Sequence, residues 1–157
     1  MNTFRCIPMN SETAARLRST RRDDRGGPVQ SRIVDRPGFP CRHCQRRGVR
    51  GEEMLLASWD LPLPQGPYWT PSPVFLHARD CPRAVLEDVL PETVTACDLV
   101  SLRHYDAAAM CLYDLGVVLA GSEAGAVLRA RIGDPRVAYV NVHSALPGCW
   151  LLRVERS

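Results

Sequence analysis

Four residues of the kinds that bind soft metal ions occur in two close pairs along the chain. Cys41 and Cys44 are three positions apart, His77 and Cys81 are four positions apart, and 32 residues separate the two pairs. Each pair can present two ligands from one tight turn while the segment between them folds back as a hairpin. The spacing therefore predicts a tetrahedral metal site with these four ligands, and zinc is the cofactor that suits it.

Two other interpretations fit the same cysteines. Free cysteine is among the residue types that are most often buried, so Cys44 and Cys81 can be ordinary core residues. A redox Cys-x-x-Cys motif needs a helix that begins after its first cysteine and a βαβ pattern around it. The flanking sequence has neither feature, so the metal site and the plain core remain the two main interpretations.

A second set of candidates lies on one face of two predicted strands. Alternation over residues 97–105 and 137–143 places the polar members of both segments on one side. An arginine fork there can hold a carboxylate or a phosphate, and a histidine can serve as a general acid or base. We therefore predict a face that binds a small anionic metabolite, although a solvated sheet face has the same pattern. The candidate ligand-binding residues are Arg103, Tyr105, Asn141 and Cys149, accompanied by Tyr139, His143 and Arg153.

The elements that must position these residues are mostly strands. Apolar patterning and turn residues predict a mostly antiparallel sheet with two or three short helices, a fold of the α+β class. Ser11 and Ser122 are the predicted helix N-caps, and residues 20–31, rich in Arg, Asp and Gly, are predicted to form a mobile loop. The predicted strands are residues 4–9, 53–59, 74–77, 97–105, 110–113, 116–119, 137–143 and 149–154. The predicted helices are residues 11–18, 83–90 and 122–132.

Length and composition predict one soluble domain. A chain of 157 residues with 45% hydrophobic and 24% charged residues can bury a core without cross-links. It has no apolar run near 18 residues, and its first residues lack the apolar region of a signal peptide. Seven cysteines, an odd number, favour reduced thiols or metal ligands. We therefore expect a cytoplasmic protein without a membrane segment.

The basic residues exclude several enzyme classes. All 20 are arginine, so the chain lacks the amine that a Schiff base, the aldimine of pyridoxal phosphate or a P-loop requires. Gly-x-Ser-x-Gly and His-Glu-x-x-His are absent too, which removes the commonest hydrolase and zinc-protease signatures.

Positive charge is concentrated at the beginning of the chain. Residues 1–50 contain 12 Arg and 4 acidic residues, and residues 51–157 contain 8 Arg and 13 acidic residues. Runs such as residues 21–25 and 46–50 could meet phosphates, but they lack the interleaved aromatics of single-strand binding and any known nucleic-acid motif. We therefore expect solvated arginines and no nucleic-acid partner.

Six short motifs, in this order, resemble those of a bacterial family catalogued as domain of unknown function 1203. They are Pro-Gly-Phe-Pro-Cys-Arg at 37–42, Gly51-Glu52, Pro67-Tyr68, Pro73-Val74-Phe75, Arg103 with Tyr105, and Gly148-Cys149. The resemblance covers nearly the whole chain. Phe39 stands where the family pattern has Tyr, and Ser72 where it has Gly, which affects local loop geometry and not the fold.

The resemblance also draws attention to Cys41 and Arg42 as a unit. A guanidinium beside Cys41 would favour its thiolate, and the pair could act on an electrophilic or anionic small molecule. The alternative function is therefore a metal-free thiol enzyme, with His43 or His143 carrying the proton. Cys41, Arg42 and His143 are its candidate catalytic residues.

A third hypothesis is a protein-interaction module without catalysis. Its motivating feature is the extended aromatic and proline-rich segment from Pro62 to Trp69, with the basic first third of the chain beside it. The leading prediction is a zinc-stabilised protein that binds a small anionic metabolite, with an enzyme of specialised metabolism as one form of it.

Overall fold

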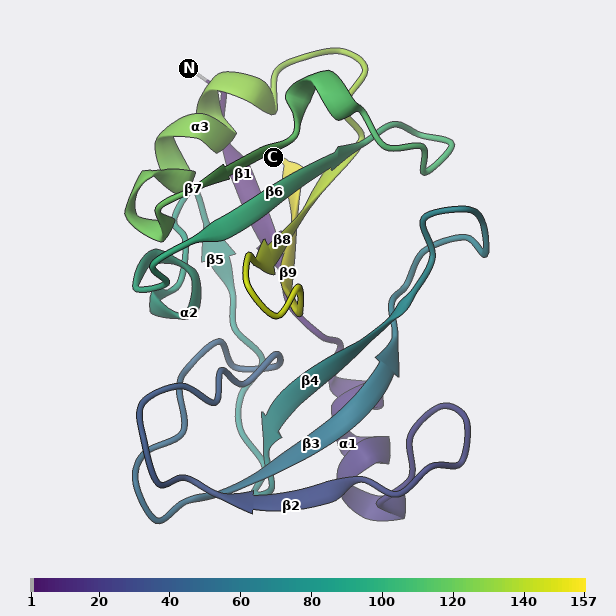
Figure 1. Cartoon of the computed structure of the whole chain (residues 1–157), viewed down its shortest axis with the longest axis vertical. Helices are drawn as coiled ribbons and strands as arrows, with labels where there is room; N and C mark the ends of the chain where they lie inside the picture. The colour runs from purple at the N-terminus through teal and green to yellow at the C-terminus, as the bar shows by residue number, and fades with distance from the viewer. Residues whose placement is uncertain (1) are drawn as a thin grey trace. The chain divides into compact units, whose positions relative to one another are not determined.

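The strands form two separate sheets, and each sheet belongs to its own part of the chain (Figure 1). The structure is a computed structural model that describes residues 2–157. A six-stranded unit comprises residues 2–7, 62–69 and 85–157, and a three-stranded unit comprises residues 8–61 and 70–84. The two units therefore alternate along the sequence.

The three-stranded unit carries the two cysteine-containing segments. Its sheet has the order β2-β3-β4, and both pairings are antiparallel. Its strands are β2 (Gln30–Ile33), β3 (Glu53–Asp60) and β4 (Pro71–His77). Apolar side chains of the two longer strands form the core of this unit, because they alternate with more exposed positions. The buried ones are Met54, Leu55, Ala57, Trp59, Val74 and Leu76.

Helix α1 (Ser11–Thr20) lies beside this sheet in Figure 1 and buries Ala14 and Leu17. Its N-cap is Asn10, whose Oδ1 accepts a hydrogen bond from the Thr13 N–H at 2.7 Å, so the prediction of Ser11 as the cap is wrong by one residue. Both side chains can cap a helix, and the Asn10 backbone has the extended conformation that a cap requires.

The six-stranded unit has the strand order β5-β1-β9-β8-β6-β7, antiparallel throughout. Its strands are β1 (Phe4–Ile7), β5 (Leu86–Glu87), β6 (Val100–Tyr105), β7 (Val117–Leu119), β8 (Tyr139–Ser144) and β9 (Trp150–Arg156). Its helices are α2 (Glu92–Thr95), α3 (Ala124–Arg131) and the 3-10 turns η1 (Tyr113–Leu115) and η2 (Gly121–Glu123). Strand β8 lies inside the sheet, which explains why Val140 and Val142 are fully buried.

Two predicted elements of this unit are wrong. The helix over 83–90 is replaced by strand β5, because Asp88 adopts a left-handed φ of 52° and donates its N–H to the Phe4 carbonyl. The strand over 110–113 is reduced to one bridge between Cys111 and Tyr105, because the chain turns just before it, where the Asp106 carboxylate accepts the N–H groups of Ala108 and Met110. In both places a local turn is stabilised by polar contacts that periodicity does not register.

The predicted α+β class with a mostly antiparallel arrangement and three helices is confirmed. Residues 20–31 form a loop closed by a bridge between Arg22 and Pro28, followed by the beginning of β2; its mobility stays a prediction. No helix within residues 2–157 combines the length and the apolar character that crossing a bilayer requires.

Candidate metal centre and polar sheet face

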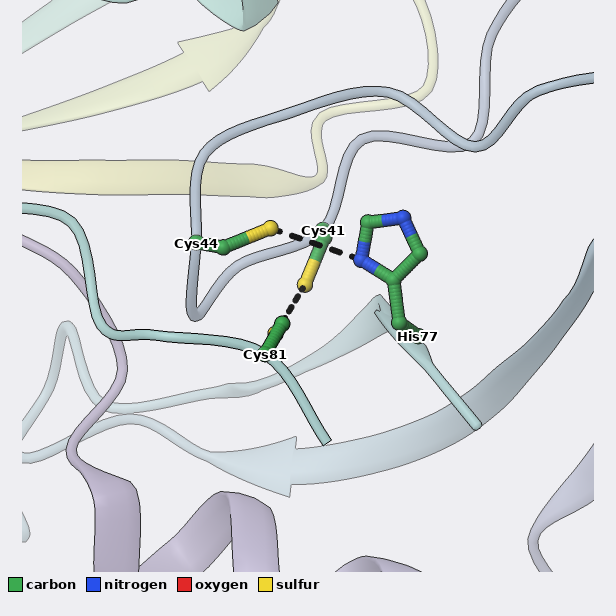
Figure 2. Close-up of side chains that lie close together, drawn as sticks. All are labelled: Cys41, Cys44, His77 and Cys81. Carbon is green, nitrogen blue, oxygen red and sulfur yellow. Dashed lines mark hydrogen bonds between the residues drawn. The ribbon is translucent and has the colours of Figure 1, made fainter. Parts of the chain in front are cut away.

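The four predicted ligands converge in the three-stranded unit (Figure 2). The sulfurs of Cys41 and Cys81 are 3.9 Å apart, and the Cys44 sulfur lies 3.4 Å from Nδ1 of His77. All four ligand atoms lie within 4.8 Å of one another. Cys41, Cys44 and His77 are buried, and Cys81 is half-buried. The sequence prediction of this set is therefore matched by its geometry.

The separations of these atoms can be compared with a tetrahedron. Bonds of about 2.3 Å to sulfur and about 2.0 Å to nitrogen give edges of about 3.8 Å between two sulfurs and about 3.5 Å between sulfur and nitrogen. The corresponding separations here are 3.9 Å and 3.4 Å. Two of the six edges therefore fit a tetrahedron, and the other four are no longer than 4.8 Å, so the cluster could hold a metal ion.

A tight loop presents the first pair of ligands. The Cys41 N–H donates to the Arg46 carbonyl at 2.9 Å, and the Gln45 N–H donates to the Cys41 carbonyl at 2.9 Å. Gln45 has a left-handed φ of 56°, which turns the chain back directly after Cys44. Cys41 and Cys44 therefore face the same side of the loop, as Figure 2 shows.

Gly48 fixes this loop against the core of the unit. A Cβ at this position would lie 2.7 Å from a methyl carbon of Val34 and 2.9 Å from the sulfur of Met54. The Gly48 N–H also donates to the Phe39 carbonyl at 3.1 Å. Only glycine permits this approach, so the loop that carries the cysteines is seated directly on the buried face of β3.

The second pair of ligands is held by α1. His77 ends strand β4, and Cys81 follows in the next loop. Arg18, whose side chain is 12% exposed, donates from Nε to the His77 carbonyl at 3.0 Å, from Nη1 to the Asp80 carboxylate at 3.0 Å and from Nη2 to the Cys81 sulfur at 3.1 Å. One guanidinium therefore clamps the loop from His77 to Cys81 onto the helix.

Glu52 supports the imidazole ligand from the side opposite the cluster. Its Oε2 lies 3.5 Å from Nε2 of His77 and accepts the Val49 N–H at 2.9 Å. A carboxylate in this position orients the ring and favours the tautomer that leaves Nδ1 free for a metal. A metal-binding histidine commonly has such an acceptor at its second ring nitrogen, in addition to its bond to the metal.

His43 contacts the cluster from within the Cys-x-x-Cys motif. Its Nδ1 lies 3.3 Å from the Cys81 sulfur, and its Nε2 lies 2.9 Å from the Ser11 hydroxyl. Burial, followed by the charges of Arg18 and Arg83, lowers the pKa of His43 below its usual value. His43 therefore links helix α1 to the ligand loop as a neutral ring.

The protonation of the four ligands is strongly coupled. A hydrogen bond with Cys44 lowers the pKa of Cys41, and a hydrogen bond with Cys41 lowers that of Cys81. Hydrogen bonds with the sulfurs of Cys41 and Cys44 raise the pKa of His77 to about 10. These donors share protons at close range, and a dication at their centre would take the place of those protons.

The contacts of Arg42 do not support the role that the thiol hypothesis assigned to it, which was to favour the thiolate of Cys41. Its Nη1 donates to the Pro40 carbonyl at 2.6 Å, and the neighbours that shift the pKa of Cys41 are Cys44, Cys81 and His77. Cys41 itself is 0% exposed. The catalytic roles of Cys41, Arg42 and His143 stay predictions.

The polar face predicted from strand alternation is present in the six-stranded unit. Strand register places Arg103 opposite Asn141 and Asn141 opposite Arg153, so three polar residues form a row across β6, β8 and β9. Tyr105 lies opposite Tyr139 in the adjacent row. Asn141 is 2% exposed and its Oδ1 accepts the indole N–H of Trp150 at 3.1 Å. Asn141 is therefore buried at the centre of the row, whereas Arg103 and Arg153 on either side of it are half-buried, a difference that the alternation alone did not indicate.

Tyr139 is enclosed between two flat groups. The Tyr105 ring stacks on it with centroids 5.1 Å apart, and the guanidinium of Arg153 lies 3.9 Å from its centroid. Tyr139 is 5% exposed, and within the described residues 2–157 its hydroxyl and the Nε of Arg153 are buried without a hydrogen-bond partner. Burial raises the pKa of Tyr139 to about 12, so its hydroxyl stays a donor. Polar atoms left this way are rare in native proteins and mark places where a bound group or water fits.

Two other predicted residues lie at the edge of this face. His143 shares the face and donates from Nδ1 to the Gly148 carbonyl at 2.9 Å, which stabilises the β8–β9 turn. Cys149 lies in that turn, where its carbonyl accepts the Ser144 N–H at 2.9 Å. The register that joins Arg103, Asn141 and Arg153 does not include Cys149.

Sequence reasoning missed Arg18 and Glu52 as supports of the ligands, and it named His43 only as a proton carrier. Arg18 and Glu52 contact the four-ligand cluster from a helix and a loop whose approach depends on the folded unit. Glu52 carried one signal, because it belongs to the Gly51-Glu52 motif quoted for the family resemblance.

No curated protein and no solved structure matches the chain significantly. A family model described as "Protein of unknown function (DUF1203)" matches residues 38–156, a range that contains all four ligands and the polar face. The chain therefore belongs to the DUF1203 family, as its short motifs indicated.

Proposed function

We propose that this chain is a zinc-stabilised protein that binds a small anionic metabolite on the polar face of its six-stranded sheet. A role as an enzyme of specialised metabolism is one use of such a site. The proposal places the protein in the cytoplasm, where its seven free cysteines would remain reduced.

Zinc is the metal that this donor set suits best. Three sulfurs and one imidazole nitrogen within 4.8 Å of one another match the ligands of structural zinc sites, and four protein ligands leave no open position. Glu52 and Arg18 add the outer hydrogen bonds that such ligands need. The metal would therefore stabilise the three-stranded unit by joining its two ligand segments.

Elemental analysis of protein purified without a histidine tag tests the zinc. About one zinc per chain is expected for the native protein, and Cys44→Ser should lose it. Cys111→Ser, which changes a half-buried cysteine of the other unit, should keep it. A metal-free native protein, or equal zinc in both variants, would remove this part of the proposal.

The buried, unpartnered hydroxyl of Tyr139 is the observation that carries anion binding. Two arginines flank it in the adjacent row, and Arg103 makes no ion pair with any of the residues that the structure describes. A bound carboxylate or phosphate could accept hydrogen bonds from the hydroxyl and from Arg103 together. Arg153 is paired with Glu155 at 2.8 Å, so Arg103 carries the uncompensated charge.

Calorimetric titration with citrate, succinate and inorganic phosphate tests this face. Arg103→Gln should weaken binding of the preferred anion about tenfold or more, as loss of a charge-assisted hydrogen bond does. Arg136→Gln removes the same charge from an exposed arginine paired with Asp114 and Asp134, and it should change little. Equal weakening by both variants would show only a general charge effect.

The thiol-enzyme alternative makes an opposite prediction for Cys41. A closed metal site should resist iodoacetamide until a chelator is added, whereas an activated nucleophile should be labelled quickly and alone. The complete burial of Cys41 within the cluster favours the metal ligand.

The interaction-module alternative has less support. Tyr68, one of the two aromatic residues of the proline-rich segment, packs edge-on against Tyr105 and shares a 2.6 Å hydroxyl contact with Tyr113. These intramolecular contacts engage one of the two aromatic side chains that docking onto a partner could use.

A further inference from the structure

A cavity of about 370 Å³ opens beside the metal centre in the three-stranded unit. Two of the four predicted ligands, His77 and Cys81, form part of its wall. Its other lining residues are Arg46, Arg47, Val49, Glu52, Arg79 and Asp80. The volume falls within the range of small-molecule sites, and half of the lining residues other than the ligands are arginine.

None of these arginines makes an ion pair with a carboxylate among residues 2–157. The Arg46 side chain instead contacts the Cys44 sulfur. Arg47 and Arg79 have no acidic partner of their own. Arg47 and Arg79 therefore favour anion binding at this cavity, with Arg46 beside them shared between the Cys44 sulfur and the cavity, because a guanidinium can offer paired N–H donors to one oxyanion.

The two acids in the cavity wall are already engaged. Glu52 accepts the Val49 N–H at 2.9 Å and lies 3.5 Å from the His77 ring. Asp80 accepts a hydrogen bond from Arg18 at 3.0 Å and another from the Cys81 N–H at 3.0 Å. The salt bridges of these two carboxylates are with Arg18 and His77, and neither carboxylate forms one with Arg46, Arg47 or Arg79.

The two ligand segments also position the arginines. Arg46 and Arg47 follow Cys44 directly in the loop, where Pro40 and Arg47 form an antiparallel bridge. Arg79 lies midway between His77 and Cys81 in the loop that Arg18 clamps. Backbone contacts therefore hold the positive groups at the cavity without help from a bound anion.

We propose that this cavity binds a phosphate monoester of a small hydroxylated molecule, with Arg46, Arg47 and Arg79 holding the phosphate beside the metal centre. The cavity is larger than a phosphate group, so an organic portion has room next to Glu52 and Asp80, whose oxygens can accept its hydroxyl groups. Among the described residues that line the cavity there is no Phe, Tyr or Trp, which favours a small phosphate ester over a stacked single-stranded nucleic acid. This site is independent of the polar face of the six-stranded unit.

Isothermal titration calorimetry with glycerol 3-phosphate, glucose 6-phosphate, inorganic phosphate and uncharged glucose tests the proposal. A phosphate ester should bind and glucose should not. The double variant Arg47→Gln with Arg79→Gln should weaken binding at least tenfold, as expected for the loss of two charge-assisted contacts. Zinc content and the thermal midpoint measured on the same samples would show that the double variant is folded.

Arg50→Gln is the matched control. Arg50 lies in the same loop but outside the cavity wall, where its Nη2 donates to the Asp35 carbonyl at 2.8 Å. Its binding constant should stay within twofold of the native value. Equal weakening in Arg50→Gln would reduce the effect to net charge and overturn the proposal.

Two further outcomes would also overturn it. One is the absence of binding by any phosphate probe to the native protein, and the other is binding of a ten-nucleotide single strand alone. Arg103→Gln distinguishes this site from the polar face, because it should leave phosphate-ester binding here unchanged. If the double variant does not fold, the Nε–H resonances of Arg46, Arg47 and Arg79 in the native protein should shift together as the ester is added, and unchanged resonances would count against the site.

Discussion

The metal centre and the polar sheet face bring polar residues together in opposite ways. At the metal centre four side chains that can donate electron pairs converge and share protons. A bound cation can take the place of those protons. At the sheet face hydrogen-bond donors predominate, and the Tyr139 hydroxyl has no acceptor among the described residues. The first arrangement suits a cation and the second suits an anion. We therefore propose ligands of opposite charge for the two regions.

Two buried histidines show the same contrast. His77 has sulfur partners that raise its pKa to about 10. His104, in the core of the six-stranded unit, has no hydrogen-bond partner for either ring nitrogen among residues 2–157, and burial lowers its pKa to about 4. Burial alone favours the neutral ring, whereas close thiolates favour the charged one.

Removal of the metal should change stability more than any other treatment. A small change would contradict the contrast between a cation site and an anion site. Chelation should lower the thermal midpoint of the native protein, because structural zinc contributes on the order of 10 kcal/mol to the folding of small units. Scanning calorimetry with and without a chelator measures this. Cys44→Ser should have the low thermal midpoint from the start, and the chelator should not lower it further. An unchanged midpoint of the native protein after chelation would argue against a bound metal.

Acidification should destabilise the six-stranded unit through His104. The folded-state pKa is about 4 and the unfolded value is 6.5, so the unfolded chain binds the extra proton first as the pH falls. The stability from the neutral ring is complete above pH 6.5 and is lost towards pH 4, by at most about 3 kcal/mol. Urea unfolding of the native protein and of His104→Leu between pH 7 and pH 4 should show a smaller pH slope in the variant. Parallel slopes would contradict this role of His104.

Loss of Arg18 should weaken the metal centre from outside its ligand set. Arg18→Met removes three hydrogen bonds to the loop from His77 to Cys81, and outer contacts of this kind contribute about 10–100-fold to metal affinity. Competition with a chromophoric chelator measures the affinity. Arg16→Met, in the same helix but paired with Asp24, should leave it unchanged.

The smallest change in the free energy of unfolding is expected for a substitution of Tyr139. Its sign is unusual, because the substitution should stabilise the protein. Tyr139→Phe removes a hydroxyl that is buried without a partner, so the ligand-free protein should gain about 1 kcal/mol of unfolding free energy. The same variant should bind the anion of the sheet face less tightly. Tyr68→Phe breaks a 2.6 Å contact with Tyr113 and should instead lose up to about 1 kcal/mol. Chemical denaturation measures both changes in unfolding free energy. If both variants changed in the same direction, the contrast between an unpartnered and a partnered hydroxyl would be contradicted.

Local patterns predicted much of the fold. Strands β3 and β4 follow their alternation over much of their length because one side of each faces a core, whereas β8 is buried on both faces. The prediction of a helix over 83–90 was wrong because this segment forms its hydrogen bonds with strand β1 and with the side chain of Arg129 on α3. Both partners are distant in sequence. Short segments of this kind take their conformation from the sheet they join.

The sequence by itself determined which side chains can bind a metal and which share a strand face, because both properties depend on spacing within a few residues. The tertiary structure decided that the two ligand pairs meet at tetrahedral separations, with Arg18 and Glu52 against them. It also decided that the hydroxyl of Tyr139 is buried without an acceptor and that Arg79 lines a cavity with Arg46 and Arg47. These contacts join segments distant along the chain, and their geometry depends on how the elements pack.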